Sequence, residues 1–193
     1  MGKKELDRFS VFIVCFVIIS LGYAQKNIMT TYPSSVKSYV EAGDKILKTN
    51  SSDPVKKIID AQEQYKKAYE KASSVVAVKY RYAYTILQLK DKNNLDWALP
   101  VLWEVASNYP EVNDTLWFGL GYIYMEKWMS AQDFANERIQ LVYKNYKDSA
   151  MMCLDNQLKV ANRSDYVKKV EKAKKEFANA EQAIINRNFE EVK

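Results

Sequence analysis

The stretch Trp117-Phe-Gly-Leu-Gly-Tyr-Ile-Tyr124 decides the fold of this 193-residue chain. Leu120, Gly121 and Tyr124 lie three, four and seven residues after Trp117, so the four residues share one face of a helix. A glycine on such a face lets a second helix approach closely, while the large side chains wedge between neighbouring helices. The stretch therefore predicts a helix packed against a hairpin partner.

The composition favours helices and argues against enzyme chemistry. The chain has 5 glycines and 4 prolines, too few for a turn-rich β fold or a glycine-rich phosphate loop. It has no histidine, which excludes histidine bases, histidine-dependent nucleophiles and histidine-ligated metals. The net charge of +5 is spread along the chain and does not indicate a nucleic-acid partner. We predict an all-α protein that is not an enzyme and uses no cofactor, metal or small-molecule substrate.

The N-terminal segment 9–24 is apolar and reads FSVFIVCFVIISLGYA, without a charge. A helix of this length covers about 24 Å, slightly less than the ~30 Å hydrocarbon core of a bilayer. Basic residues precede it, and Gly22-Tyr23-Ala24 resembles a signal-peptide cleavage site, so the segment is either a cleaved secretory signal or a retained anchor. We prefer a single-pass anchor at residues 1–25, with membrane lipid as a partner; a secreted or periplasmic protein is the alternative.

Helix-start signals and apolar stripes divide the rest of the chain into short helices. Ser34 or Ser35 is expected to cap the first helix, which Gly43 weakens, and Asp53-Pro54 gives the second a side-chain acceptor followed by a proline. The expected helices span about 34–47, 53–73, 75–90, 96–109, 113–127, 130–143, 148–158 and 164–186. Asp96 and Asp148 are the expected caps of two of them. Short successive helices of this kind predict an array of antiparallel hairpins.

Residues 117–124 match the tetratricopeptide pattern W-x₂-L-G-x₂-Y, although Ala131 follows Gly121 sooner than the pattern's alanine does. Residues 80–146 resemble the mitochondrial fission 1 protein family, whose two-repeat domain has the same shortened spacing. The family's Y-A-W corresponds to Tyr82-Ala83-Tyr84, and its D-I and L-L-E correspond to Asn94-Leu95 and Leu102-Trp103-Glu104. Its A-V-G-x-Y and Y-x-x-A correspond to Gly119-Leu120-Gly121-Tyr122-Ile123 and to Trp128 with Ala131.

This resemblance implies a tetratricopeptide-like domain at residues 53–162, preceded by a linker and arm helix at 26–52 and followed by an amphipathic helix at 163–193. It also implies a mitochondrial membrane protein. Members of the family carry their anchor at the C-terminus, whereas the apolar segment here is N-terminal. We therefore expect an accessory or scaffold subunit of a mitochondrial membrane complex of respiratory-chain type. The family's own role, an adaptor that recruits a dynamin-like GTPase to the membrane, is the alternative.

Two sets of apolar side chains are candidate contact surfaces for other protein subunits. By tetratricopeptide geometry, the first helices of two hairpins face a concave groove with Tyr80, Tyr84 and Leu87, and with Phe118, Tyr122 and Met125. Aromatic anchors dominate binding energy at interfaces, so an exposed groove of this kind would hold a partner. The chain's own helix at 36–47 or its N-terminal arm is the alternative occupant.

The second set is a seam on the C-terminal helix, with apolar residues at alternating steps of four and three. The seam consists of Val170, Ala173, Phe177, Ala180 and Ile184. Such a stripe either docks on another chain or caps the end of a helical array, and we prefer capping. The lysines around it, between residues 168 and 175, are expected to be solvated, with contact to anionic lipid as the alternative.

Overall fold

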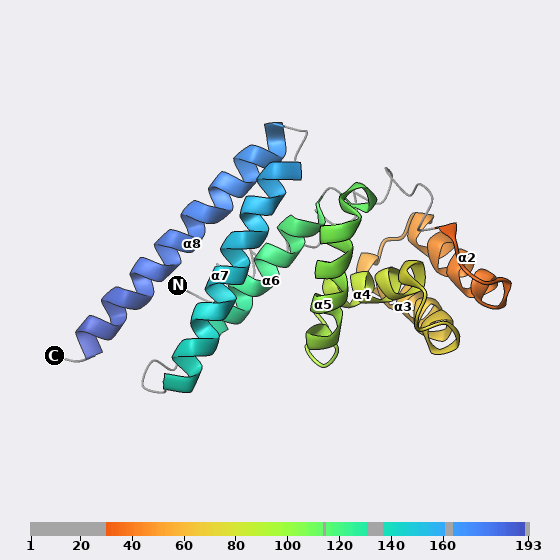
Figure 1. Ribbon diagram of the computed structural model, residues 1–193, viewed down its shortest axis with the longest axis horizontal. Helices are drawn as coiled ribbons and strands as arrows, with labels where there is room; N and C mark the ends of the chain where they lie inside the picture. Colours follow the sequence, from red (N-terminus) through yellow and green to blue (C-terminus); the bar gives the residue numbers. More distant parts are fainter. Residues whose placement is uncertain (1–29, 114, 131–136, 161–163, 192–193) are drawn as a thin grey trace. The chain divides into compact units, whose positions relative to one another are not determined.

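The computed structural model describes residues 30–113, 115–130, 137–160 and 164–191 (Figure 1). Within these ranges the chain forms seven α-helices, one short 3-10 helix and no strand, so the prediction of an all-α protein is confirmed. The elements are α2 (Ser34–Lys48), α3 (Pro54–Lys71), α4 (Val76–Leu89), α5 (Leu95–Asn108), η3 (Pro110–Val112), α6 (Leu116–Ser130), α7 (Glu137–Val160) and α8 (Ser164–Glu191).

The chain divides into two compact units, residues 1–113 and residues 114–193, and each is described by itself. The division falls inside the domain expected at 53–162, whose limits remain a prediction. The anchor or signal expected at 1–25 lies outside the described residues. Among the helices that are described, none is both long and apolar enough to cross a membrane.

The start of α3 forms as its sequence predicts. The Asp53 carboxylate accepts a hydrogen bond of 2.9 Å from the Lys56 backbone N–H, which has no partner within the helix, and Pro54 opens the first turn. The expected serine cap of α2 is wrong. Pro33 occupies the N-cap position and provides no side-chain cap, and its carbonyl oxygen accepts a hydrogen bond of 3.1 Å from the Val36 N–H.

Helices α2 and α3 are antiparallel and cross closely at Gly43. A Cβ atom on Gly43 would lie 2.5 Å from Cε1 of the Tyr65 ring, so this position admits only glycine without a shift of the ring. The helix weakness expected at Gly43 is therefore also the feature that allows the two helices to meet. Towards the start of α2, Val36 and Val40 pack with Ala68 of α3 and Val78 of α4 in one buried cluster.

Helix α4 is the central element of unit 1, because side chains on all of its faces are buried between Ala77 and Gln88, Lys79 excepted. Lys90 closes the helix in the left-handed conformation, with φ 51°. Helix α5 begins after Asn94, so Asp96 lies in its first turn rather than at the cap. Pro100 lies inside α5 with its ring exposed.

In unit 2 the helix boundaries differ from the expected ones. Helix α6 continues to Ser130 without a break at 127–129, and α7 is one helix where two were expected at 130–143 and 148–158. Residues 144–148 read Lys-Asn-Tyr-Lys-Asp and contain neither glycine nor proline, so nothing in them ends a helix. Asp148, expected as a cap, lies exposed within α7.

Gly121 is the crossing point of α6 and α7, as the sequence predicts. A Cβ atom there would lie 3.0 Å from Leu154 Cδ2 and 3.5 Å from the Ala150 carbonyl oxygen. The residues opposite Gly121 thus come from the middle of α7. Ala131, the expected partner, lies outside the described residues. Helix α8 packs beside this hairpin, so α6, α7 and α8 form three neighbouring layers of unit 2 (Figure 1).

Candidate functional site

The three groove residues of unit 1 lie on α4 and are buried. Tyr80, Tyr84 and Leu87 are 5%, 6% and 6% exposed, so none presents its side chain to solvent. The Tyr80 hydroxyl accepts a hydrogen bond of 3.2 Å from the Asn113 side-chain amide, and its ring stacks on Tyr84 at 5.5 Å between centroids. Burial raises the pKa of Tyr80 well above its usual value. A partner would reach these residues only after whatever covers them had moved.

The three groove residues of unit 2 lie on α6. Met125 is buried, whereas Phe118 and Tyr122 are partly buried and meet edge to face at 4.8 Å between centroids. Both rings pack against the buried cluster of Leu154, Val170 and Ala173. The two sets of groove residues belong to different units, and a groove shared between them remains a prediction.

The C-terminal seam faces the interior of unit 2 over its first half. Val170, Ala173 and Phe177 are at most 2% exposed, and the Phe177 ring lies 4.3 Å from that of Trp128 on α6. Ala180 is partly buried, and the side chain of Ile184 lies outside the described part of α8. This placement supports the interpretation that the seam caps the array.

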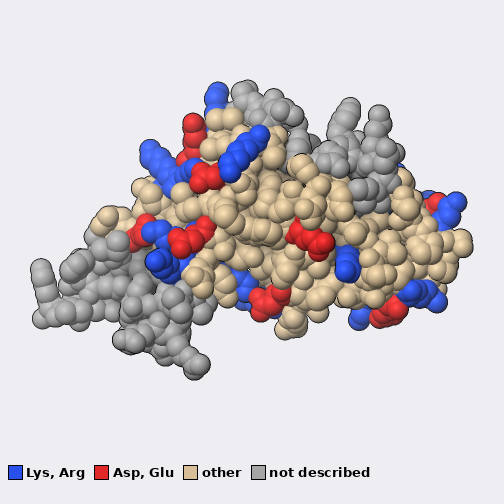
Figure 2. All heavy atoms as spheres, in the orientation of Figure 1, with Lys and Arg blue, Asp and Glu red and all other residues tan. Residues whose placement is uncertain are grey.

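Lysines around the seam pair with nearby carboxylates. Lys169 lies 3.3 Å from Asp165, Lys172 lies 3.8 Å from Glu176, and Lys174 is bonded to Asp155 of α7. On the face shown in Figure 2, basic and acidic side chains are interspersed over a mostly uncharged surface. That face presents no broad patch of a single sign.

A buried polar cluster, which no sequence pattern indicates, joins three helices of unit 1. The Arg81 guanidinium of α4 forms two hydrogen bonds to the Asp44 carboxylate of α2, at 2.9 and 3.1 Å, and a third to the Ala77 carbonyl. The Tyr65 hydroxyl of α3 donates to the same carboxylate at 2.7 Å. Burial is the largest influence on the pKa of Arg81 and would lower it, but the hydrogen bonds and charge of Asp44, with smaller contributions from Tyr65 and Tyr32, together outweigh burial and the pKa is raised. The cluster fixes helices rather than a ligand.

A second buried polar contact joins the helices of unit 2. The Gln157 side chain is 0% exposed, and its oxygen accepts a hydrogen bond of 2.9 Å from the Phe118 backbone N–H. Phe118 lies in the first turn of α6, where N–H groups have no partner within the helix. A side chain of α7 therefore caps α6.

Val55 and Ile59 form the exposed apolar surface that sequence reasoning missed. They lie one turn apart on α3 and are 45% and 42% exposed; Met152 on α7, at 48%, is the third large apolar residue of this kind in the described ranges. The apolar pattern of residues 53–73 predicts both on an inward stripe together with Ile58 and Tyr65. The buried series on α3 is Ile58, Ala61, Tyr65 and Ala68. Ile59 lies on a different face of the helix from that series, together with the charged residues Glu63 and Lys66. This spacing is the sequence signal that indicates its exposure.

Metal-binding chemistry has no visible basis in the described ranges, where no three His, Cys, Asp or Glu side chains gather closely enough to hold an ion. Cys153 is buried in α7, which raises the pKa of its thiol.

The chain matches no model of a known protein family, no well-characterised protein and no solved structure.

Proposed function

We propose that this chain is a non-catalytic, membrane-anchored helical protein that binds other proteins, as an accessory or scaffold subunit of a mitochondrial membrane complex. The observation that carries the proposal is the exposed pair Val55 and Ile59 on the outer side of a helical array. Large apolar side chains one turn apart on a helix are typical anchors for a partner. Their exposure in the isolated chain is what a subunit separated from its neighbours would show.

The length of the hairpin formed by α4 and α5 supports a repeat protein of tetratricopeptide type. Helices α4 and α5 together span about 33 residues, close to the ~34 residues of a tetratricopeptide repeat. Helices α6 and α7 span about 45 residues, which is longer than such a repeat. Helices α4 and α5 therefore have the length of such a repeat, whereas the hairpin whose first helix carries the W-x₂-L-G-x₂-Y pattern, α6 with α7, is a lengthened form of it.

The buried polar groups support a structural rather than a catalytic role. Asp44, Arg81 and Tyr65 satisfy one another, and Gln157 bonds to the backbone of a neighbouring helix. Groups used in this way hold helices in register and are not available to a substrate. The membrane part of the proposal rests on the apolar segment 9–24.

The subunit proposal is tested by substituting both exposed apolar residues of α3 with aspartate, V55D/I59D. In protein extracted with mild detergent from its native membrane, the unmodified chain should migrate with a large complex on a native gel. The double variant should migrate as a free chain, because two charges would be buried at the interface. Met152→Asp on α7 is the matched control, since it adds one charge at an equally exposed apolar residue and should leave the complex intact.

Two results would contradict the proposal. A wild-type chain that migrates alone after mild extraction is not a subunit of a stable complex. A mature chain whose intact mass lacks residues 1–24 has no retained N-terminal anchor. Far-UV circular dichroism of V55D/I59D should match that of the wild type, because both side chains are already more than two fifths exposed.

A further inference from the structure

We propose that the end of unit 1 at which α2 begins lies against a bilayer surface that carries anionic headgroups. This inference rests on the proposed function, because it requires the N-terminal segment to remain as an anchor. The inference goes beyond the proposed function because it states which surface of unit 1 faces the membrane and which surface remains available to protein partners.

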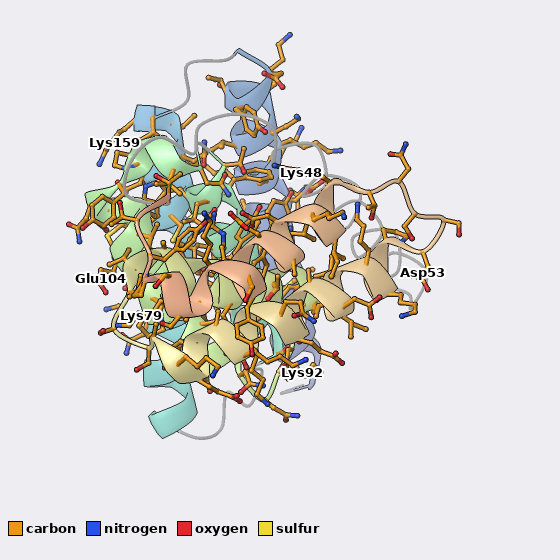
Figure 3. All side chains as sticks on the ribbon, turned by 90° about the vertical axis from the view of Figure 1, so that its right-hand side faces the viewer. Lys48, Asp53, Lys79, Lys92, Glu104 and Lys159 are labelled. Atoms are coloured by element: carbon orange, nitrogen blue, oxygen red, sulfur yellow. The ribbon has the colours of Figure 1, made fainter. Side chains whose placement is uncertain are left out.

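The packing of unit 1 brings three chain segments together at this end. The start of α2 lies beside the end of α3, because Val36 and Val40 pack with Ala68, and the Lys71 Nζ lies 5.8 Å from the centre of the Tyr39 ring. The start of α4 joins them through Val78. We call this region the α2-start face. Asp53, at the start of α3, lies at the opposite end of these helices from Lys79 in Figure 3.

Chain connectivity places the α2-start face near any membrane that holds the N-terminal segment. The apolar run ends at Ala24 and α2 begins at Ser34. Ten residues of fully extended chain span at most about 35 Å. Helix α2 is itself about 22 Å long, so its far end can stand well away from the bilayer while its start remains close.

Partly exposed tyrosines gather on the α2-start face. Tyr32, Tyr39 and Tyr69 pack against the buried cluster and are partly exposed. The Tyr69 ring also meets the rings of Tyr82 and Trp97, at 5.4 and 5.0 Å between centroids. Tyrosine is enriched where a membrane meets water, because its ring is apolar and its hydroxyl is polar. Val55 and Ile59, which lack such a polar tip, lie at the other end of α3.

Lysines supply charge complementarity to anionic headgroups. On α2, α3 and the first turn of α4, this end carries more lysines than glutamates. The lysines are Lys37, Lys66, Lys67, Lys71 and Lys79, and the glutamates are Glu41 and Glu70. Glu41 lies 3.8 Å from Lys37, with both side chains more than half exposed, whereas Lys66, Lys67 and Lys79 make no ion pair with any residue that the structure describes.

Two lysines at the opposite end of α2 and α3 are already bonded. Lys56 bonds to both oxygens of Asp60, at 2.9 and 3.0 Å. Lys57 donates to the carbonyl oxygens of Leu47 and Thr49, both at 3.1 Å. Lys45 and Lys48 lie in the last turn of α2, where cations interact favourably with the helix carbonyls. Lys71 lies in the last turn of α3 in the same way. The two ends therefore differ in that Lys56 and Lys57 are bonded at one end, whereas Lys66, Lys67 and Lys79 at the other make no ion pair with a described residue.

The experiment uses the full chain in vesicles, with an environment-sensitive fluorophore on single introduced cysteines. The background is Cys15→Ser, and Cys153 should resist labelling because it is 0% exposed. Ser35 at the start of α2 and Ser52 before α3 are both exposed, so Ser35→Cys and Ser52→Cys form a matched pair. On phosphatidylcholine vesicles containing phosphatidylserine, the label at Ser35 should shift to shorter wavelength and be quenched by spin-labelled lipid. The label at Ser52 should keep its emission in water.

Charge variants test the role of the lysines. K37E/K71E/K79E should abolish most of the shift at Ser35, and the matched triple variant K45E/K48E/K56E should leave it unchanged. An equal shift at Ser35 on vesicles of phosphatidylcholine alone would overturn the proposed recognition of anionic headgroups. Equal emission from Ser35 and Ser52 on the anionic vesicles would overturn the orientation as a whole.

Failure of the inference can be told apart from failure of the proposed function. If the full chain floats with vesicles after an alkaline carbonate wash but the two labels behave alike, the anchor stands and only the inference is wrong. If the chain is removed by the wash, the anchor is wrong, and the inference that rests on it is overturned as well.

Discussion

At the scale of single residues, the Asp44 carboxylate is the most sensitive point of unit 1. It is the shared acceptor of Arg81 and Tyr65, and Arg81 is only 5% exposed. Breaking a buried ion pair costs more than the pair contributes, since it leaves a charge buried without a partner. Asp44→Ala should lower the free energy of unfolding by about 3 kcal/mol, measured by urea denaturation in mild detergent.

The surface pair Lys56–Asp60 provides the control for this prediction. Both side chains are well exposed, at 67% and 44%, so water replaces the lost partner. Lys56→Ala should leave the urea midpoint unchanged within error. If Asp44→Ala and Lys56→Ala lowered the free energy of unfolding by similar amounts, the buried cluster of Asp44, Arg81 and Tyr65 would stabilise unit 1 no more than an exposed ion pair does.

Gly43 is a second single-residue determinant. Alanine is intrinsically better than glycine inside a helix by about 1 kcal/mol, but its Cβ would lie 2.5 Å from the Tyr65 ring. Overpacking of this kind typically costs about 1–3 kcal/mol, so Gly43→Ala should destabilise the protein on balance. A urea denaturation series measures the change.

A double-mutant cycle separates the clash from helix propensity. In a Tyr65→Leu background the ring is gone, and the same Gly43→Ala change should become neutral or stabilising. If Gly43→Ala has equal effects in both backgrounds, the close approach seen between α2 and α3 does not limit this position.

At the scale of elements, α6 depends on a residue that lies about 40 positions later in the chain. Gln157→Met keeps the volume of the side chain and removes the oxygen that accepts from the Phe118 N–H. Leaving a buried N–H without a partner should cost about 1–3 kcal/mol in the free energy of unfolding. Gln157→Glu retains an acceptor near the positive end of α6 and should recover part of the loss. A methionine variant as stable as the wild type would contradict this capping role.

Helices were predictable where a local signal determined them. Asp53 and Pro54 start α3 because the cap and the first turn are made within four residues. The two helices expected around residues 144–148 are one helix, since Asp148 has the chemistry of a cap but no preceding break. A side chain that favours a helix start does not create one inside a continuous helix.

The candidate contact surfaces were less predictable than the helices. Repeat geometry predicts Tyr80, Tyr84 and Leu87 in an open groove, yet all three side chains are buried. Whether a helical face is covered depends on which other element packs there, and spacing along one helix carries no such information. Val55 and Ile59 were missed for the same reason, because an apolar residue at the edge of a stripe can face either way.

At the scale of the whole molecule, the absence of histidine predicts how stability depends on pH. No histidine titrates near neutrality, and the pKa of the Cys153 thiol is raised by burial. Folding should therefore neither bind nor release protons between about pH 6 and pH 7.5, and the free energy of unfolding should be flat there. From about pH 8 the Cys153 thiol ionises in the unfolded chain while the folded chain keeps its proton, so the free energy of unfolding begins to fall. A clear slope between about pH 6 and pH 7.5, measured by urea denaturation at several pH values, would contradict this expectation.

At higher pH the tyrosines add to this loss. Burial raises the pKa values of Tyr65 and Tyr80 far above their usual value, and burial with the nearby Glu176 charge raises the pKa of Tyr122 to about 12. In the unfolded chain these hydroxyls lose their protons near pH 10, while the folded chain retains them. The unfolded state then binds fewer protons, so the stability present below pH 10 is lost progressively as the pH rises towards the folded values. Tyr122→Phe removes one such group, and its free energy of unfolding should fall less steeply than that of the wild type between about pH 10 and 12. Parallel slopes would mean that the Tyr122 hydroxyl ionises equally well in the folded and unfolded chains, and that unit 2 leaves this ring open to water.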